Sequence, residues 1–192
     1  RLMRILVTGV AKAGKSTVLR VLSEMNYITV NASDLLINSG CVKWNNKYQS
    51  YDITDVDCAA SVINSAILKC SWSCAIESVA YQLIDPSHID LVIVVRRNPM
   101  ELFEEYNKLR WPCVKMFNNM VSEVTGSHVR EVYSLFNNKV RQLIFTQNIG
   151  ELRDKVRRLV GGGLDETVDW LSNSDEEKLH SMLMYLERCI SN

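Results

Sequence analysis

Eight residues near the start of the chain have the types and spacing of a phosphate-binding loop. Residues 9–16 are Gly-Val-Ala-Lys-Ala-Gly-Lys-Ser, which fits the pattern G-x-x-x-x-G-K-S. The backbone N–H groups of such a loop can surround phosphates, and the N-terminus of a following helix favours negative charge. We predict that Lys15 reaches the β- and γ-phosphates of a nucleotide and that Ser16 offers its hydroxyl to Mg²⁺. The alternative is a glycine-bounded turn that binds nothing.

The segments on either side of this loop support the nucleotide interpretation. Residues 4–8 form a short apolar run typical of a strand, and residues 17–22 are compatible with a helix. Strand, loop and helix therefore occur in the order that a phosphate-binding loop requires. We expect the nucleotide to contact the following residues: Gly9, Ala11, Lys12, Ala13, Gly14, Lys15, Ser16 and Thr17.

A phosphoryl-transfer enzyme also needs an acidic residue and a cation near the loop. Glu77 ends a predicted strand at residues 73–77, and we expect it to act in catalysis and to bind Mg²⁺. Arg110 lies between two predicted helices, in a segment (109–117) that we interpret as a lid. A lid cation would stabilise the charge of the transferred group, so we predict that Arg110 is catalytic, with a solvated surface arginine as the alternative. A GTPase is disfavoured because the sequence has no D-x-x-G motif.

The order of the predicted elements indicates the fold class. Strands are expected at 4–8, 27–31, 73–77, 90–95 and 140–146, and helices at 15–25, 33–38, 56–69, 99–108, 114–136 and 148–160. This alternation is typical of a parallel sheet between helical layers. We therefore predict an α/β, three-layer P-loop fold with five parallel strands, in a core at 1–160. Three glycines at 161–163 are expected to form a hinge. A helical extension is expected at 164–192, with one helix at 164–171 and a second helix that begins after a cap at Ser174.

Composition limits the partners and the compartment. The 22 basic and 22 acidic side chains cancel, which gives no support for bulk binding to nucleic acid. No apolar run approaches the roughly 20 residues of a membrane helix, so we expect a cytoplasmic protein, or a nuclear one in a eukaryote. The six cysteines are expected to be reduced thiols rather than disulfides or metal ligands. His88, His128 and His180 are far apart, and we expect surface or packing roles for them.

Several blocks in this order resemble the adenylate kinase isoenzyme 6 type, also called the coilin-interacting nuclear ATPase, and its archaeal relatives. The blocks, which lie between residue 3 and about 160, are 5–9 with 14–17, 27–31 with Asp34 and Leu35, 92–96 with Asn98 and Pro99, and Arg110 and Trp111 with Lys115, Asn119 and Glu123. The resemblance implies an adenylate-kinase-like sheet, Mg·ATP as ligand, AMP as a possible acceptor, and combined adenylate kinase and ATPase activity. It also implies work in small-ribosomal-subunit maturation through a ribosomal protein.

Three departures from that family bear on the mechanism. Where the family has Asp-x-His, this chain has Glu77, Ser78 and Val79, so the imidazole is missing. Ile37 occupies the place of an arginine that would hold the acceptor phosphate, and a bidentate cation is lost there. Lys12 replaces a loop glycine.

Residues 39–57 are expected to form the acceptor-binding insertion, in which the aromatic side chains either stack on a base or pack the insertion. The sequence leaves two functions open: an enzyme, or a nucleotide-binding interaction protein that hardly turns ATP over. Arg96 and Arg97, at the end of the fourth predicted strand, contact either phosphate or an acidic partner.

Overall fold

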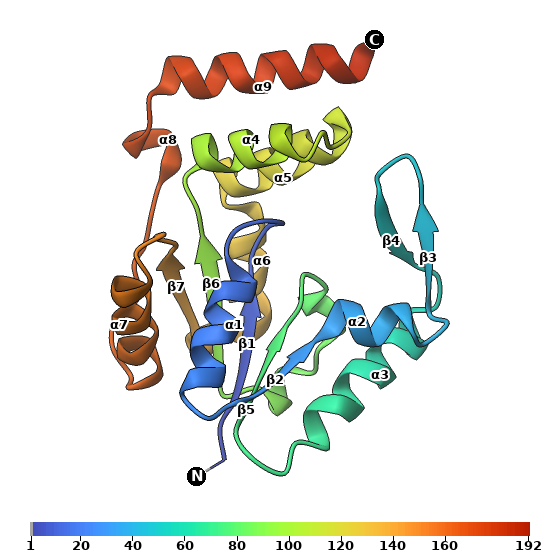
Figure 1. The fold of residues 1–192 in the computed structure, drawn as a ribbon, viewed down its shortest axis with the longest axis vertical. Coiled ribbons are helices and arrows are strands. Elements are labelled where there is room, and N and C mark those ends of the chain that lie inside the picture. The colour runs from blue at the N-terminus through green and yellow to red at the C-terminus, as the bar shows by residue number, and fades with distance from the viewer. Residues whose placement is uncertain (1) are drawn as a thin grey trace.

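The computed structural model describes residues 2–192. It has three layers, a five-stranded parallel sheet between two layers of helices (Figure 1). The strand order is β2-β5-β1-β6-β7. The strands are β1 (Arg4–Thr8), β2 (Ile28–Asn31), β5 (Cys74–Glu77), β6 (Leu91–Arg96) and β7 (Val140–Ile144). All four neighbouring pairs are parallel, so the predicted fold class and all five predicted strands are confirmed.

Both faces of the sheet are buried, which explains the continuous apolar runs in its strands. Successive side chains of β6 enter different cores: Leu91, Ile93 and Val95 pack on one face, and Val92 and Val94 on the other. Helices α1 (Lys15–Glu24) and α7 (Ile149–Val160) cover the first face. Helices α3 (Val56–Leu68) and α6 (Ser127–Phe136) cover the second.

Several helices begin at side chains that cap their first turn. The Asn148 side chain accepts a hydrogen bond from the Glu151 N–H at the start of α7, as predicted. Asn98 caps α4 (Pro99–Lys108) and is followed by a proline at the first helical position. Asn31 caps α2 (Ala32–Ile37), and short 3₁₀ helices occur at Tyr81–Leu83, Pro86–His88 and Asn137–Lys139.

The prediction of one helix at 114–136 is wrong. The segment forms α5 (Cys113–Thr125) and α6, which are separated by Gly126 at a φ of 66°. Glycine adopts this left-handed conformation without steric cost, and it commonly ends a helix. An isolated glycine inside a helical pattern is also tolerated, so the periodicity gave no clear sign of the break.

The predicted helix at 164–171 is wrong for residues 164–169. These six residues are extended beside β7, where the Glu166 N–H donates to the Gln142 carbonyl (3.0 Å) and the Ile144 N–H donates to the Glu166 carboxylate (2.8 Å). The open edge of a sheet needs hydrogen-bond partners, and that requirement overrides local helix preference. The first helix after it is α8 (Trp170–Asn173).

The last helix, α9 (Glu176–Ser191), lies across α4 and α5 in Figure 1. Asp175 rather than the expected Ser174 caps it, by accepting from the Lys178 N–H. Leu179, Met182 and Leu186 are buried in the same core as α4 and α5. Within residues 2–192 no helix combines the length and apolar character needed to span a bilayer.

An antiparallel hairpin that was not predicted, β3 (Val42–Asn45) and β4 (Ser50–Ile53), extends from the body beyond α2 (Figure 1). Each strand has four residues, and several of these are polar. So short a run carries little alternation, and the signal is therefore weak.

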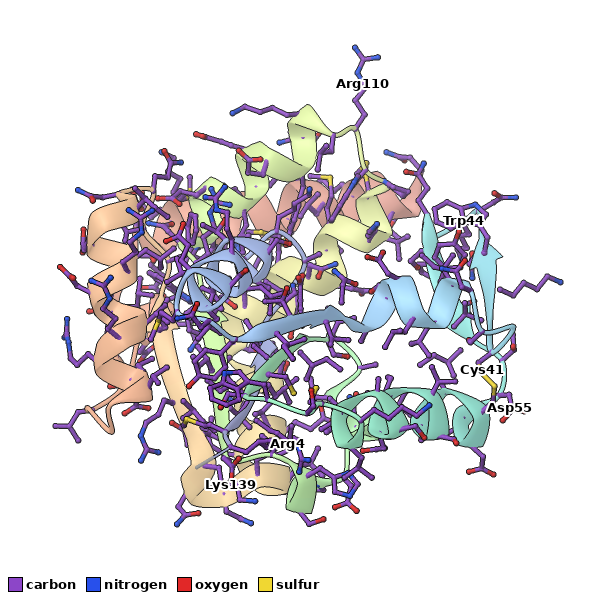
Figure 2. All side chains as sticks on the ribbon, turned by 60° about the horizontal axis from the view of Figure 1, so that its bottom comes forward. Arg4, Cys41, Trp44, Asp55, Arg110 and Lys139 are labelled. Carbon is purple, nitrogen blue, oxygen red and sulfur yellow. A yellow bond between two sulfur atoms is a disulfide. The ribbon has the colours of Figure 1, made fainter. Side chains whose placement is uncertain are left out.

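Four of the six cysteines form disulfides, so the expectation of reduced thiols is wrong for them. Cys41, before β3, is bonded to Cys58 in the first turn of α3 (Figure 2), and Cys113 at the start of α5 is bonded to Cys189 in α9. Cys70 and Cys74 are free. The bonded pairs are 17 and 76 residues apart, and such spacings do not reveal pairing.

Candidate active site

The loop between β1 and α1 requires glycine at both of its ends. Gly9 has a φ of 149° and Gly14 a φ of 109°, conformations that other residues rarely adopt. A Cβ atom on Gly14 would lie 2.2 Å from a ring carbon of Phe145, and one on Gly9 would lie 2.6 Å from the Val95 carbonyl oxygen. The glycines of the sequence motif therefore serve close packing as well as the turn.

Neighbouring elements fix the path of this loop. The Tyr106 hydroxyl of α4 donates to the Ala11 carbonyl (2.6 Å), and the Ala11 N–H donates to Asn119 of α5 (3.1 Å). Arg97, just after β6, donates to the Lys12 carbonyl (2.8 Å). These three contacts come from different elements, so the loop is shaped before any phosphate enters it.

Lys15 lies inside the curve of the loop. Its Nζ donates to the carbonyl oxygens of Gly9 (3.0 Å) and Val10 (2.7 Å), and the residue is only 7% exposed. Burial lowers the pKa of Lys15 from 10.5 to about 8, while the charges of Glu77 and Glu123 oppose this shift. An anion beside Nζ would favour the protonated ammonium, which is the form that binds phosphate.

Ser16 and Glu77 bring two oxygen-bearing side chains together beside Lys15. The Ser16 hydroxyl lies 3.3 Å from each carboxylate oxygen of Glu77, and the Asn31 amide lies 3.4 Å from one of them. Mg²⁺ prefers oxygen ligands and usually takes one or two carboxylates together with phosphates and waters. The donor set fits that ion, although Glu77 and Ser16 come from elements 61 residues apart.

A cavity of about 500 Å³ opens beside the loop, a volume in the usual range for small-molecule sites. It lies at the carboxyl ends of β1 and β5, which is where ligands bind in open α/β sheets. The lining residues are Gly9, Val10, Ala11, Tyr48, Ser50, Val79, Tyr81, Gln82, Lys115, Asn118, Asn119, Ser122 and His128. A second cavity of about 200 Å³, between α2 and the hairpin, shares Ser50 and Val79 with the first.

Lys115 is the single lysine or arginine among these lining residues. Its Nζ donates to the Gln49 carbonyl of the hairpin (2.8 Å) and lies 3.8 Å from the centre of the Trp111 ring. Burial, and then the charge of Lys12, lower the pKa of Lys115. Ile37 lines the smaller cavity with an apolar side chain. Among residues 2–192, Lys115 is therefore the only lysine or arginine on the walls of either cavity.

The three other predicted cations are placed differently. Arg110 has a φ of 51°, is exposed and points away from the body of the molecule (Figure 2). Arg96 binds Glu123 (2.9 Å) and Gln142 (2.7 Å), and Arg97 binds Glu101 (3.1 Å) in addition to the loop. The structure thus brings Lys15, Ser16 and Glu77 together and leaves Arg110 outside. Arg96, the last residue of β6, and Arg97, which follows it, both have acidic partners.

The sequence analysis assigned no site role to Ser122 and expected only a surface or packing role for His128. Ser122 and His128 line the cavity from α5 and α6, and their side chains touch: Oγ lies 3.0 Å from Nδ1. A spacing of six residues places two side chains on different faces of one continuous helix. The break at Gly126 brings them together, and recognising that break was the only route to the pair.

Comparison with known proteins agrees with this geometry. The family model described as "AAA domain" matches residues 5–126. The protein named "Putative adenylate kinase" of Sulfurisphaera tokodaii is 30% identical over 192 residues, covering 99% of this chain and 96% of that protein. A protein of the same name from Pyrobaculum aerophilum is 26% identical over 187 residues, covering 95% of this chain and 92% of the relative.

Solved structures match the fold at much lower sequence identity. TT1252 from Thermus thermophilus aligns with a TM-score of 0.57 at 10% identity, covering 84% of this chain and 97% of that one. Shikimate kinase from Acinetobacter baumannii, solved in complex with shikimate, aligns with a TM-score of 0.54 at 16% identity, covering 83% and 91%. The arrangement of sheet and helices is therefore that of P-loop kinases. The chain belongs to the AAA domain family and to the family of the Sulfurisphaera tokodaii protein.

Proposed function

We propose that this protein is a Mg·ATP-dependent phosphotransferase of the adenylate kinase type, with AMP as acceptor and with ATP hydrolysis as a second reaction. One observation carries the proposal: Lys15 lies inside a preshaped glycine loop, next to the Ser16–Glu77 oxygen pair, and residues 9–11 of the same loop line the 500 Å³ cavity. The names of the relatives support the choice of AMP. The isoenzyme 6 type is the variant that the sequence resembles.

Each residue has a chemical role in this proposal. The loop amides and Lys15 hold the phosphates of ATP, and Ser16 and Glu77 hold Mg²⁺, which when bound neutralises charge on the phosphates. The Arg110 side chain points away from the body (Figure 2), so the lid at 109–117 must close and turn it inward. In that closed state Arg110 stabilises the charge of the transferred group. Lys115 is the cation on the cavity wall that contacts the acceptor phosphate.

A second candidate function follows from the apolar walls of the smaller cavity, which together with the β3–β4 hairpin we call the acceptor side. Ile37 is 43% exposed and Val79 53% exposed, and both line the smaller cavity, where an acceptor phosphate would need a cation. A protein that binds ATP without transferring phosphate would tolerate such walls. In that case ATP occupancy changes the shape of the protein for a partner, which the resemblance suggests is a small-subunit ribosomal protein or a pre-ribosome in the cytoplasm or nucleus.

An assay with two conditions separates these functions. ADP formation is measured with Mg·ATP plus AMP, and phosphate release with Mg·ATP alone. ADP formation that depends on AMP supports the kinase, and phosphate release without AMP supports the ATPase. If neither is detected while calorimetry shows ATP binding, the switch is supported. Absence of ATP binding contradicts all three.

The ribosomal partner needs its own experiment. The protein is sedimented with small ribosomal subunits from its source organism in the presence of ATP or ADP. Co-sedimentation that depends on the nucleotide supports a role in subunit maturation, whereas equal recovery in the pellet with and without subunits contradicts it.

A further inference from the structure

A buried histidine lies at the wall of the proposed catalytic cavity with acceptors on both sides of its ring. His128 is 7% exposed, and Nδ1 lies 3.0 Å from both the hydroxyl and the carbonyl oxygen of Ser122. On the opposite side, Nε2 lies 3.4 Å from Oε2 of Glu123. Within residues 2–192, neither of these last two atoms has a hydrogen-bond partner of normal geometry.

Glu123 is held in place as a carboxylate. It is completely buried, and its other oxygen, Oε1, accepts hydrogen bonds from Arg96 Nε (2.9 Å), the Arg97 N–H (3.1 Å) and Trp170 Nε1 (2.9 Å). Three donors, one of them charged, therefore fix the position of Oε1. The carboxyl group is held so that its second oxygen, Oε2, faces His128.

This arrangement suits a histidine that gains a proton during a reaction. Burial lowers the pKa of His128 below its ordinary value, so the ring is neutral at neutral pH. Charged groups that act on it are Glu123 of α5, which opposes this shift, and Arg96 of β6 and Lys15 of α1, which add to it. In the neutral tautomer that carries its proton on Nε2, the Ser122 hydroxyl can donate to Nδ1, but the Ser122 carbonyl oxygen also faces Nδ1 with no proton between them. In the protonated ring both nitrogens are donors, and each has an oxygen to receive its hydrogen bond.

We propose that Ser122, His128 and Glu123 form a proton relay for the water that attacks ATP, an inference that rests on the proposed function. As the water oxygen forms its bond to the γ-phosphorus and the bond to the β-bridging oxygen breaks, the water gives its proton to Ser122 Oγ. The hydroxyl proton of Ser122 passes to Nδ1 of His128. The resulting imidazolium is stabilised by Glu123 and later returns the proton to solvent through Ser122.

The relay distinguishes water from AMP as the nucleophile. A phosphate monoester has a second pKa near 6, so at neutral pH the attacking oxygen of AMP is already largely an anion. Water must lose a proton as it attacks. The relay therefore assists hydrolysis more than it assists transfer to AMP.

The test compares His128→Gln and Ser122→Ala with the wild-type protein from pH 5.5 to 8.5. Glutamine keeps polar atoms at the site but does not titrate. We expect kcat for hydrolysis to fall about 10- to 100-fold in both variants, with KM for ATP unchanged within about twofold. The ratio of hydrolysis to AMP phosphorylation falls at least about tenfold. The wild-type kcat decreases at pH values below the pKa of His128, and this decrease disappears in His128→Gln. His180→Gln, the same change at an exposed position of α9, behaves as wild type.

Several results would overturn the relay. Hydrolysis and AMP phosphorylation that fall together in both variants indicate a structural role, as does an acid limb that persists in His128→Gln. If His128→Gln does not melt cooperatively, Ser122→Ala decides, because unchanged hydrolysis in that variant contradicts the relay. A wild-type protein that phosphorylates AMP without hydrolysing ATP refutes the relay alone. One that binds ATP but does neither removes the proposed kinase as well.

Discussion

The phosphate side and the acceptor side of the cavity are built differently. On the phosphate side, Tyr106, Asn119 and Arg97 bind the loop from separate elements, and a core of 0–9% exposed side chains supports it. On the acceptor side, the hairpin of the two four-residue strands β3 and β4 extends from the body, and its Trp44 and Tyr51 side chains are 47% and 46% exposed. These two rings contact each other edge to face, with their centres 5.1 Å apart.

This difference separates what is fixed from what can vary. The phosphate side has no freedom to change shape without disturbing the core, because its glycines touch Phe145 and Val95. The hairpin is joined to the rest by the Cys41–Cys58 bond and by Lys115 at Gln49. Changes on the phosphate side should therefore be severe, and changes on the acceptor side graded.

The largest effect is expected for Lys15→Ala. Removing the buried ammonium eliminates the charged hydrogen bonds to phosphate, and we expect Kd for ATP to rise about a thousandfold, or about 4 kcal/mol. Lys69→Ala, at an exposed lysine directly after α3, is the matched control and should bind as wild type. Isothermal titration calorimetry measures Kd for ATP in both variants and in the wild type. An affinity unchanged by Lys15→Ala would remove the distinction between the two sides.

Gly14→Ala should be nearly as severe, but in stability. The new Cβ meets the Phe145 ring at 2.2 Å in a backbone conformation that disfavours side chains, so we expect a loss of about 3 kcal/mol. For a protein of this size that corresponds to a fall in Tm of about 6–12 °C. Gly40→Ala is the control, since Gly40 has a φ of 79° but open space around it, and it should cost about 1 kcal/mol. Equal losses would show that backbone conformation, rather than packing, makes the loop glycine necessary.

The pH dependence of ATP affinity should sharpen the picture of the phosphate side. The pKa of Lys15 is lowered to about 8 in the free protein, and bound phosphate raises it, so binding takes up a proton above pH 8. Between pH 7.5 and 9 we expect Kd to rise about tenfold. Calorimetry in buffers of different ionisation enthalpy detects the proton directly. Lys15→Ala should show no proton uptake from this group, and a flat pH profile in the wild type would contradict the assignment.

The same shift affects the free protein in the opposite direction. Because the folded pKa lies below the unfolded value of 10.5, the folded state releases a proton first as pH rises. The penalty of the buried charge is therefore present in full below about pH 8, and the free energy of unfolding rises as pH increases from about 8 to 10.5, where the penalty is gone.

The smallest effect is expected for Lys115→Ala, on the acceptor side. Loss of this cation should raise KM for AMP about fivefold, or about 1 kcal/mol, and leave KM for ATP nearly unchanged. Steady-state kinetics with each nucleotide varied in turn measures both. Lys47→Ala, at the exposed tip of the hairpin, is the control. If KM for ATP rises as much as KM for AMP, Lys115 belongs to the phosphate side.

The sequence predicted the phosphate side well and the acceptor side poorly, for physical reasons. Continuous apolar runs and loop glycines are local signals, and they located all five sheet strands and the loop. The Ser16–Glu77 contact joins two residues that the sequence analysis expected to bind Mg²⁺. The hairpin, both disulfides and the Ser122–His128 contact depend on residues that meet only after folding. The extended segment at 164–169 depends on the open edge of β7, which local preference does not report.

The bond between Cys113 and Cys189 has a consequence for proteolysis. It closes the chain from α5 to α9 into a covalent ring that includes the exposed glycines 161 and 162. A protease that cuts this ring once leaves the two pieces attached, so a non-reducing gel shows one band where a reducing gel shows two. The severed tail also keeps its place over the helix that carries Ser122 and Glu123, and a nicked molecule should still bind ATP.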